Sequence, residues 1–151
     1  MVDSHASEPP TNPRDYSTAA ERKVGRWDDT SLVRVLDAAA NRATEGLRVA
    51  EDYARFVLDD RLLTESGKQI RHALTDVLRA IPTSARHAAR ETLTDVGTEF
   101  GLPAESQRAD AWAVCAANLK RAEQALRSLE EFAKIADVEC GGRFEALRYR
   151  L

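Results

Sequence analysis

Two stretches of the chain, residues 41–55 (NRATEGLRVAEDYAR) and 120–134 (KRAEQALRSLEEFAK), place arginines and carboxylates at the same steps. The recurring arginines are Arg42 and Arg48 in the first stretch and Arg121 and Arg127 in the second. Arginine binds phosphate oxygens bidentately, and carboxylates hold Mg²⁺ together with substrate phosphates. If the two stretches face one cleft, their composition suits a phosphorylated substrate.

A solvated helix surface is the alternative explanation of the charges. In the first stretch, five polar positions share the helix face opposite the apolar stripe: Asn41, Glu45, Arg48, Asp52 and Arg55. Pairs such as Glu51 with Arg55 would then form an ion-pair ladder in which each pair contributes only about 0.2–0.5 kcal/mol. Gly46 is open to two interpretations as well, because a glycine inside a helix permits either close helix packing or close approach of a ligand.

The loop TDVGTEFG, residues 94–101, is a further candidate for anion binding. Asp95 before Gly97 allows a tight turn, and the backbone N–H groups of such a turn can form an anion-binding nest. Arg86 and Arg90 precede the loop at one helical turn from each other. We expect the loop to close over the cleft, with an ordinary polar turn as the alternative.

The elements that must position these residues are all helical. Apolar residues recur at helical spacing, and no segment alternates as a strand. The pattern predicts an all-α bundle of four to five helices, near residues 30–58, 62–81, 84–92, 109–137 and 142–151. Thr83 or Ser84 would cap the third helix, and Gly141 with Gly142 would precede the last. The two long helices repeat, which suggests two helical hairpins related by pseudo-symmetry.

Composition limits the class of protein. Residues 1–26 are polar, carry prolines and lack an apolar period, so we expect a disordered tail before a helical domain at 27–151. A formal charge of −3 gives no general attraction to nucleic acid or to an anionic membrane. Two cysteines make no disulfide framework, and no signal peptide or membrane span is evident. We therefore expect a cytoplasmic protein.

The longest motifs resemble a known family. RVLDAAANRATEGLRVAEDYARFVLDD, IRHAL, DVGTE, NLKRAEQALRSLEEFAKI and FEALRYRL occur in the order found in the alternative hydroxymethylpyrimidine phosphate kinases of thiamine biosynthesis. That domain is often fused in front of thiamine phosphate synthase, so the synthase is a candidate partner. The resemblance covers residues 31–151. It implies that ATP and 4-amino-5-hydroxymethyl-2-methylpyrimidine phosphate react to give the diphosphate and ADP.

Such a reaction needs Mg²⁺, ATP as co-substrate and several cations. The resemblance does not assign roles to residues, so we select candidates by their chemistry. The catalytic candidates are Glu45, Arg48, Asp52 and Arg127. The candidates for substrate and phosphate binding are Asn41, Arg42, Arg86, Arg90, Asp95, Gly97, Thr98, Asn118 and Arg121. The candidate metal ligands are Glu51, Glu130 and Glu131.

Two other classes of function fit the sequence. A metal-free helical mutase or lyase could act on a small polyanion through an arginine-lined cavity alone. A non-catalytic helical module could dock onto a synthase barrel, which would require an exposed apolar patch. In each case the partners are a small molecule or the synthase, and formation of a homo-oligomer is left open.

Overall fold

Five helices make up the described part of the chain, which is residues 26–90 and 108–151 of a computed structural model. They are α1 (Thr30–Phe56), α2 (Arg61–Leu78), α3 (Thr83–Ala88), α4 (Ala111–Ala136) and α5 (Val138–Arg148). No strand occurs in these two ranges, so the predicted all-α class is confirmed. The predicted loop at 94–101 and, apart from Arg26, the predicted tail lie outside the described residues.

Aspartate side chains start four of the helices. Each accepts hydrogen bonds from N–H groups of the first turn, which would otherwise lack a partner inside the helix. These caps are Asp29 for α1, Asp60 for α2, Asp110 for α4 and Asp137 for α5. A cap of this kind stabilises a helix by about 1 kcal/mol. The short helix α3 differs, because it follows Pro82 without a side-chain cap, and the predicted cap at Thr83 or Ser84 is wrong.

The last helix begins earlier than predicted, and the two glycines lie inside it. The side chain of Asp137 accepts from the N–H groups of Glu139 and Cys140, which starts α5 at Val138. A Cβ at position 141 would lie 2.5 Å from Lys134 Cγ and 3.1 Å from the backbone oxygen of Glu130. Gly141 therefore lets α5 approach α4 closely, and it does not break the helix.

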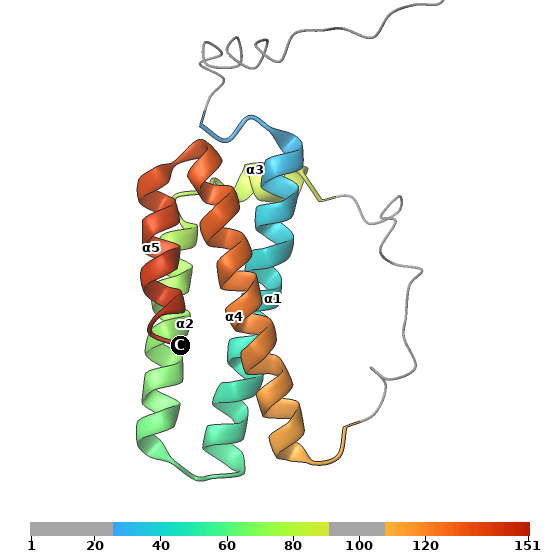
Figure 1. Cartoon of the computed structure of the whole chain (residues 1–151), viewed down its shortest axis with the longest axis vertical. Coiled ribbons are helices and arrows are strands. Elements are labelled where there is room, and N and C mark those ends of the chain that lie inside the picture. Colours follow the sequence, from blue (N-terminus) through green and yellow to red (C-terminus); the bar gives the residue numbers. More distant parts are fainter. Residues whose placement is uncertain (1–25, 91–107) are drawn as a thin grey trace, which may run out of the picture.

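The helices form two antiparallel hairpins, α1 with α2 and α4 with α5 (Figure 1). The hairpins pack so that α1 lies against α4 and α2 lies against α5, while α3 packs on α1. The largest side chains that are completely buried between them include Leu36, Leu47, Leu74, Leu126 and Phe144. The apolar stripes read from the sequence thus meet in one core.

Small residues allow the two long helices to come together. A Cβ at position 46 would lie 2.6 Å from the backbone oxygen of Asn118 and 3.1 Å from Ala122 Cβ. Ala43 and Ala125 are buried beside this point. Of the two interpretations of Gly46, the structure confirms close helix packing.

The repeat extends into the second helix of each hairpin. Glu51 of α1 accepts from Arg71 Nε of α2 at 2.9 Å, and Glu130 of α4 accepts from Arg148 Nε of α5 at 2.8 Å. Glu51 and Glu130 are the corresponding acids of the two repeats. In each hairpin the arginine also follows the aspartate cap by the same number of residues. The hairpins therefore share a sequence pattern, a topology and an ion pair, as the predicted pseudo-symmetry requires.

One end of the bundle leaves large apolar side chains exposed. They lie in and around the α1–α2 turn and at the start of α4: Phe56, Val57, Leu58, Leu62, Leu63 and Trp112. Val57, Leu63 and Trp112 continue the apolar periods of their helices, so the sequence predicts that they are buried, and for these three the prediction is wrong. The reason is that α5 is shorter than α2 and stops before this end (Figure 1). None of the helices within 26–90 or 108–151 has the length and apolar character needed to span a bilayer.

Replacing Gly46 with alanine should destabilise the protein although alanine is the better helix former. The added Cβ has a backbone oxygen 2.6 Å away, so α1 and α4 must separate. We expect a loss of about 1–3 kcal/mol in the free energy of unfolding, as for other overpacked cores. Gly67→Ala is the matched control, because its Cβ would meet Glu51 Cβ at 3.8 Å, an ordinary contact. The control should gain up to about 1 kcal/mol in urea unfolding. Equal effects of the two substitutions would contradict the packing argument.

Candidate functional site

A hollow on the outer face between α1 and α4 brings together one arginine from each repeat. Its volume is about 180 Å³, and its lining residues are Arg42 of α1 with Arg121, Gln124, Ala125 and Ser128 of α4. We refer to it as the arginine hollow. Arg42 and Arg121 occupy corresponding positions of the two repeats. The pseudo-symmetric pairing of the long helices therefore places two guanidinium groups at one site.

The charges of this pair are not neutralised by a described carboxylate. Arg121 donates from Nη1 to Asn118 Oδ1 at 3.1 Å, and Asn118 in turn donates to the backbone oxygen of Val114 at 2.8 Å. Arg42 has no ion pair with another residue of the described ranges. Two guanidinium groups with free donors can bind phosphate oxygens bidentately. The arginine hollow is therefore suited to an anion.

A second polar cluster lies where α3 packs on α1, and its centre is a residue that the sequence analysis missed. The carboxylate of Asp37 is buried and accepts from Arg90 Nε at 2.6 Å and Arg90 Nη2 at 3.2 Å. Asn41 Nδ2 donates to it at 3.4 Å, and Arg86 Nη1 lies 3.8 Å away. The hydrogen bond and charge of Asp37 raise the pKa of Arg90.

Three candidates for substrate binding, Asn41, Arg86 and Arg90, thus meet around one acid. Two arginines face a single carboxylate, so the cluster keeps a positive charge. The buried Nε of Arg86 has no hydrogen-bond partner among the described residues. The signal in the sequence was Asp37 itself, an acid directly after Leu36 on the apolar side of the helix.

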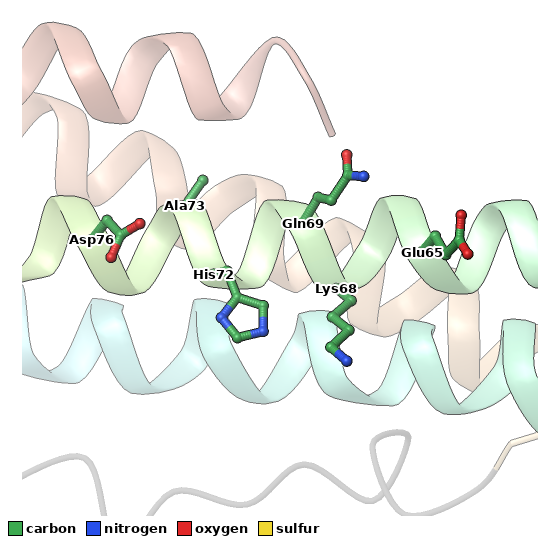
Figure 2. Close-up of a pocket in the computed structure, with 6 residues that line it drawn as sticks. All are labelled: Glu65, Lys68, Gln69, His72, Ala73 and Asp76. Carbon is green, nitrogen blue, oxygen red and sulfur yellow. The ribbon is translucent and has the colours of Figure 1, made fainter.

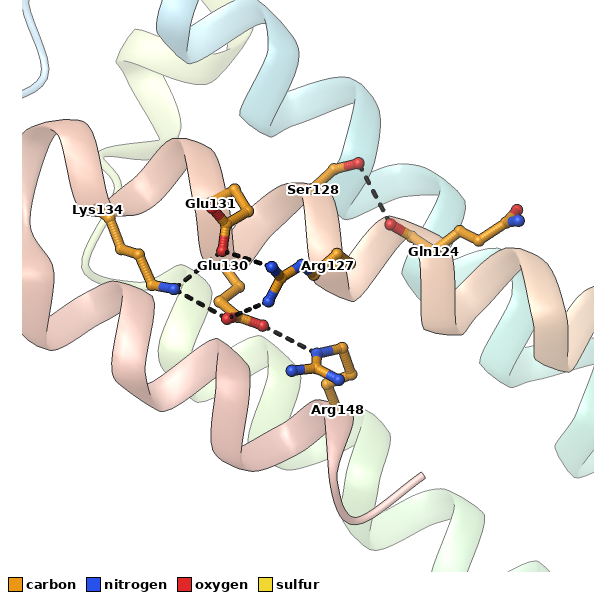
Figure 3. Close-up of polar contacts among 7 residues, drawn as sticks. All are labelled: Gln124, Arg127, Ser128, Glu130, Glu131, Lys134 and Arg148. Atoms are coloured by element: carbon orange, nitrogen blue, oxygen red, sulfur yellow. Dashed lines mark hydrogen bonds and ion pairs between the residues drawn. The ribbon is translucent and has the colours of Figure 1, made fainter.

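Glu130 is the most deeply buried acid of the described residues, and three cations surround it (Figure 3). It accepts from Arg127 at 2.7 Å, Lys134 at 2.9 Å and Arg148 at 2.8 Å. Burial alone would raise the pKa of Glu130. The hydrogen bonds from Lys134 and Arg148 and the charge of Arg127 outweigh burial and lower this pKa to about 2. Glu130 is therefore ionised at neutral pH and joins α4 to α5.

The three proposed metal ligands all have cationic partners. Glu51 binds Arg71, so the ladder pair with Arg55 is not formed, and Glu131 binds Arg127 at 3.2 Å and Lys134 at 2.9 Å. Within the described ranges, no three His, Cys, Asp or Glu side chains are grouped as a metal site. The metal assignments of Glu51, Glu130 and Glu131 remain predictions, and ion pairing is the role that the structure shows for these residues.

The remaining candidates are not gathered with the arginine hollow by any described contact. Glu45, Arg48 and Asp52 are exposed on α1 and form no ion pair with the described residues. Arg127 binds Glu130 and Glu131 of its own helix, and neither Arg48 nor Arg127 lines the arginine hollow. Asp95, Gly97 and Thr98 lie outside the described residues.

A larger hollow on α2 lacks the features of a site. It has a volume of about 430 Å³ and is lined by Glu65, Lys68, Gln69, His72, Ala73 and Asp76. All six residues belong to one helix, and Figure 2 shows that Gln69 and His72 point to different sides of it. Binding sites usually need polar groups that converge from several elements. His72 is exposed here, in agreement with a surface role.

Comparison with known proteins identifies the family of the chain. Residues 34–151 match the model of the ThiD2 family. The chain belongs to this family. The match contains both repeats, the arginine hollow and the Asp37 cluster. It confirms the family resemblance drawn from the sequence and places the chain in thiamine biosynthesis.

The similar proteins are larger. The chain is 45% identical over 126 residues to a thiamine-phosphate synthase of Synechocystis sp., with 81% of this chain and 34% of that protein covered. It is 44% identical over 123 residues to the thiamine-phosphate synthase of Rhodopirellula baltica, with 82% and 33% covered. The chain thus spans about a third of the length of the curated relatives it matches. No solved structure matches the chain.

Replacing Glu130 with glutamine should destabilise the fold in a pH-dependent way. The substitution leaves three cations without their shared anion, which should cost about 3 kcal/mol at pH 7. The folded pKa of about 2 lies below the usual value near 4.3. The contribution of Glu130 is therefore complete above about pH 5 and is lost as pH falls from about 4.3 through 2.

The measurement is urea unfolding of wild type and E130Q between pH 7 and pH 3. The difference in unfolding free energy should shrink toward pH 3. Glu131→Gln is the matched control, since Glu131 shares Arg127 and Lys134 but is half exposed, and it should change stability by less than about 1 kcal/mol. A difference for E130Q that is constant with pH would refute the ionised state of Glu130.

Proposed function

We propose that this protein phosphorylates 4-amino-5-hydroxymethyl-2-methylpyrimidine phosphate to its diphosphate, with ATP as donor and Mg²⁺ as metal. The observation that carries the proposal is the arginine hollow, where Arg42 and Arg121 meet without a described carboxylate partner. Membership of a thiamine-biosynthesis family supports the identity of the acceptor.

The chemistry requires cations more than a general base. An oxygen of the acceptor phosphate attacks the γ-phosphorus of ATP, and the bond from that phosphorus to the β–γ bridging oxygen breaks, so that ADP leaves. The attacking oxygen is already ionised near neutral pH, because the second pKa of a phosphate monoester is about 6. The barrier therefore lies in bringing two anions into line, which positioned cations reduce.

The described residues suggest a division of roles. Arg42 and Arg121 hold a phosphate of one substrate, with Gln124 and Ser128 beside them in the hollow. Mg²⁺, when bound, neutralises charge on the transferred phosphoryl group. Glu45 and Asp52 on α1 are better placed to bind it than Glu51 or Glu130, since they are exposed and carry no described cation. The Asp37 cluster, with its net positive charge, is a second position for a phosphate.

A second candidate function is a non-catalytic module of a thiamine-phosphate synthase. The exposed apolar end of the bundle around Phe56, Leu62 and Trp112 is the observation that favours it, since patches of this kind mark interaction sites. The relatives that carry a similar domain are named for the synthase reaction. In that case the arginine hollow would bind anions without turnover.

A coupled assay separates the two functions. The purified chain is incubated with ATP, Mg²⁺ and the pyrimidine monophosphate, ADP release is followed, and the diphosphate is identified by mass spectrometry. The kinase produces ADP and diphosphate in equal amounts and stops when Mg²⁺ is chelated. If protein with a native helical circular dichroism spectrum forms no diphosphate, the kinase proposal fails and the module remains.

Arg42→Ala and Arg121→Ala should each reduce kcat/KM by about ten- to a hundredfold. Each removes a charge-assisted contact worth about 1.5–3 kcal/mol. Lysine at either position should restore only part of the loss, because a point charge cannot replace the bidentate fork. Arg61→Ala is the control, since Arg61 is an exposed arginine in a helical pair with Glu65 and lies away from the hollow. Wild-type kinetics in both variants would show that the substrate phosphate does not bind in the arginine hollow.

A further inference from the structure

An apolar cavity lies between α1, α2 and α4, at the end of the bundle that α5 does not reach. Its volume is about 240 Å³, and its wall includes Leu47, Ile70, Cys115 and Leu119. Tyr53 and Trp112 also line it, with ring centroids 5.9 Å apart and planes inclined by 51°. The cavity therefore offers apolar walls and two aromatic rings.

Core packing alone does not account for this arrangement. Protein interiors are close-packed, with few voids larger than a water molecule. Here Trp112 remains 57% exposed beside a cavity that its indole could help to fill. Small-molecule pockets are lined mainly by hydrophobic and aromatic side chains, and an accessible ring can stack on a flat ligand.

Positive charge lies next to the cavity. A groove of about 440 Å³ shares Trp112 and Leu119 with the cavity and is also lined by Lys120, Glu123 and Arg148. Lys120 pairs with Glu123 at 3.0 Å, while Arg148 donates from Nε to Glu130 and lies over the Tyr149 ring at 4.4 Å from its centroid. The ammonium of Lys120 has three N–H donors, of which the pair with Glu123 uses one, so Lys120 can also donate to an anionic group in the groove. The cavity and the groove together suit a flat apolar ring that carries a phosphate.

We propose that the cavity binds an aminopyrimidine ring against Trp112 and Tyr53, with the attached phosphate in the groove beside Lys120 and Arg148. This rests on the proposed function only for the identity of the ligand. Both substrates of that reaction contain an aminopyrimidine, one as the free ring and the other within adenine. The volume lies just below the range of roughly 300–1,000 Å³ typical of small-molecule pockets, so it fits one ring system and leaves the rest of the ligand outside.

This site is distinct from the arginine hollow. Arg42 precedes Leu47 by more than one helical turn and lies on the outer face of α1, whereas Leu47 faces the core. One substrate would thus place its ring at the end of the bundle, while the other substrate places a phosphate at the crossing of α1 and α4.

The test measures the fluorescence of Trp112, which should change when a ligand binds in the cavity. The chain has two tryptophans, and Trp27 is packed against the opposite end of the core, so Trp27→Phe leaves a single fluorophore at the cavity. This variant is titrated separately with ADP and with the pyrimidine monophosphate. Saturable quenching by one of them identifies the source of the ring. Absence of a saturable change with both would overturn the proposal.

Two substitutions in the otherwise native chain define the site by calorimetry. Trp112→Leu should weaken binding of the quenching ligand about ten- to a hundredfold, through loss of ring stacking. Gly67→Leu should fill the cavity and abolish binding, and Gly67→Ala, which adds a methyl group in ordinary contact, should retain it. Undiminished binding by Trp112→Leu, or by Gly67→Leu with native circular dichroism, would overturn the proposal. If Gly67→Leu unfolds, the result for Trp112→Leu decides.

Failure of this proposal and failure of the kinase assignment give different results. Quenching of Trp112 without formation of diphosphate keeps the ring site and rejects the kinase. Turnover by the Trp27→Phe variant without any change at Trp112 keeps the kinase and rejects the ring site.

Discussion

The absence of a side chain at position 46 sets the distance between the two longest helices. A backbone oxygen of α4 lies 2.6 Å from where a Cβ of residue 46 would stand, so any larger residue would push the helices apart. The alanines at 43, 122 and 125 have small side chains, so the two helices also lie close together along the rest of this contact. Because α1 and α4 are this close, Arg42 and Arg121 open onto one hollow. The candidate anion site is thus a consequence of helix packing.

The hairpins around that contact are fixed by repeated polar interactions. In each hairpin an aspartate caps the second helix, and an arginine from that helix binds a glutamate of the long helix. The two copies differ in burial. Glu51 keeps one described cation and remains partly accessible, whereas Glu130 is fully buried and needs three cations to remain ionised. The ion pair that both hairpins share is thus a buried charge centre in only one of them.

Three places in the described part of the chain carry chemistry that the core does not require. The arginine hollow and the Asp37 cluster are both cationic and suit phosphates. The apolar cavity at the end of the bundle suits a ring. The proposed reaction between a nucleoside triphosphate and a phosphorylated pyrimidine would need both kinds of surface. Their positions on one small bundle give each proposed substrate a binding position that can be tested.

The sequence by itself determined the helices, because the period of apolar residues and the aspartate caps are local signals. It also revealed the repeat, since Arg42 and Arg121 recur at matching steps. It failed at Gly141, where a glycine that permits close packing of α5 on α4 resembled a helix break. It also could not show that Glu51 pairs with Arg71 instead of Arg55, because Arg71 reaches Glu51 only in the folded hairpin.

Only the tertiary structure decided which charges meet. A helical wheel gives the direction of a side chain but not the element that it faces. Periodicity therefore did not single out Asp37, because Arg86 and Arg90 reach it only where α3 packs on α1. For the same reason Trp112 read as a core residue, although α5 ends too early to cover it. Periodicity is a property of one helix. The neutralisation of a charge and the burial of a ring depend on residues of the neighbouring helices.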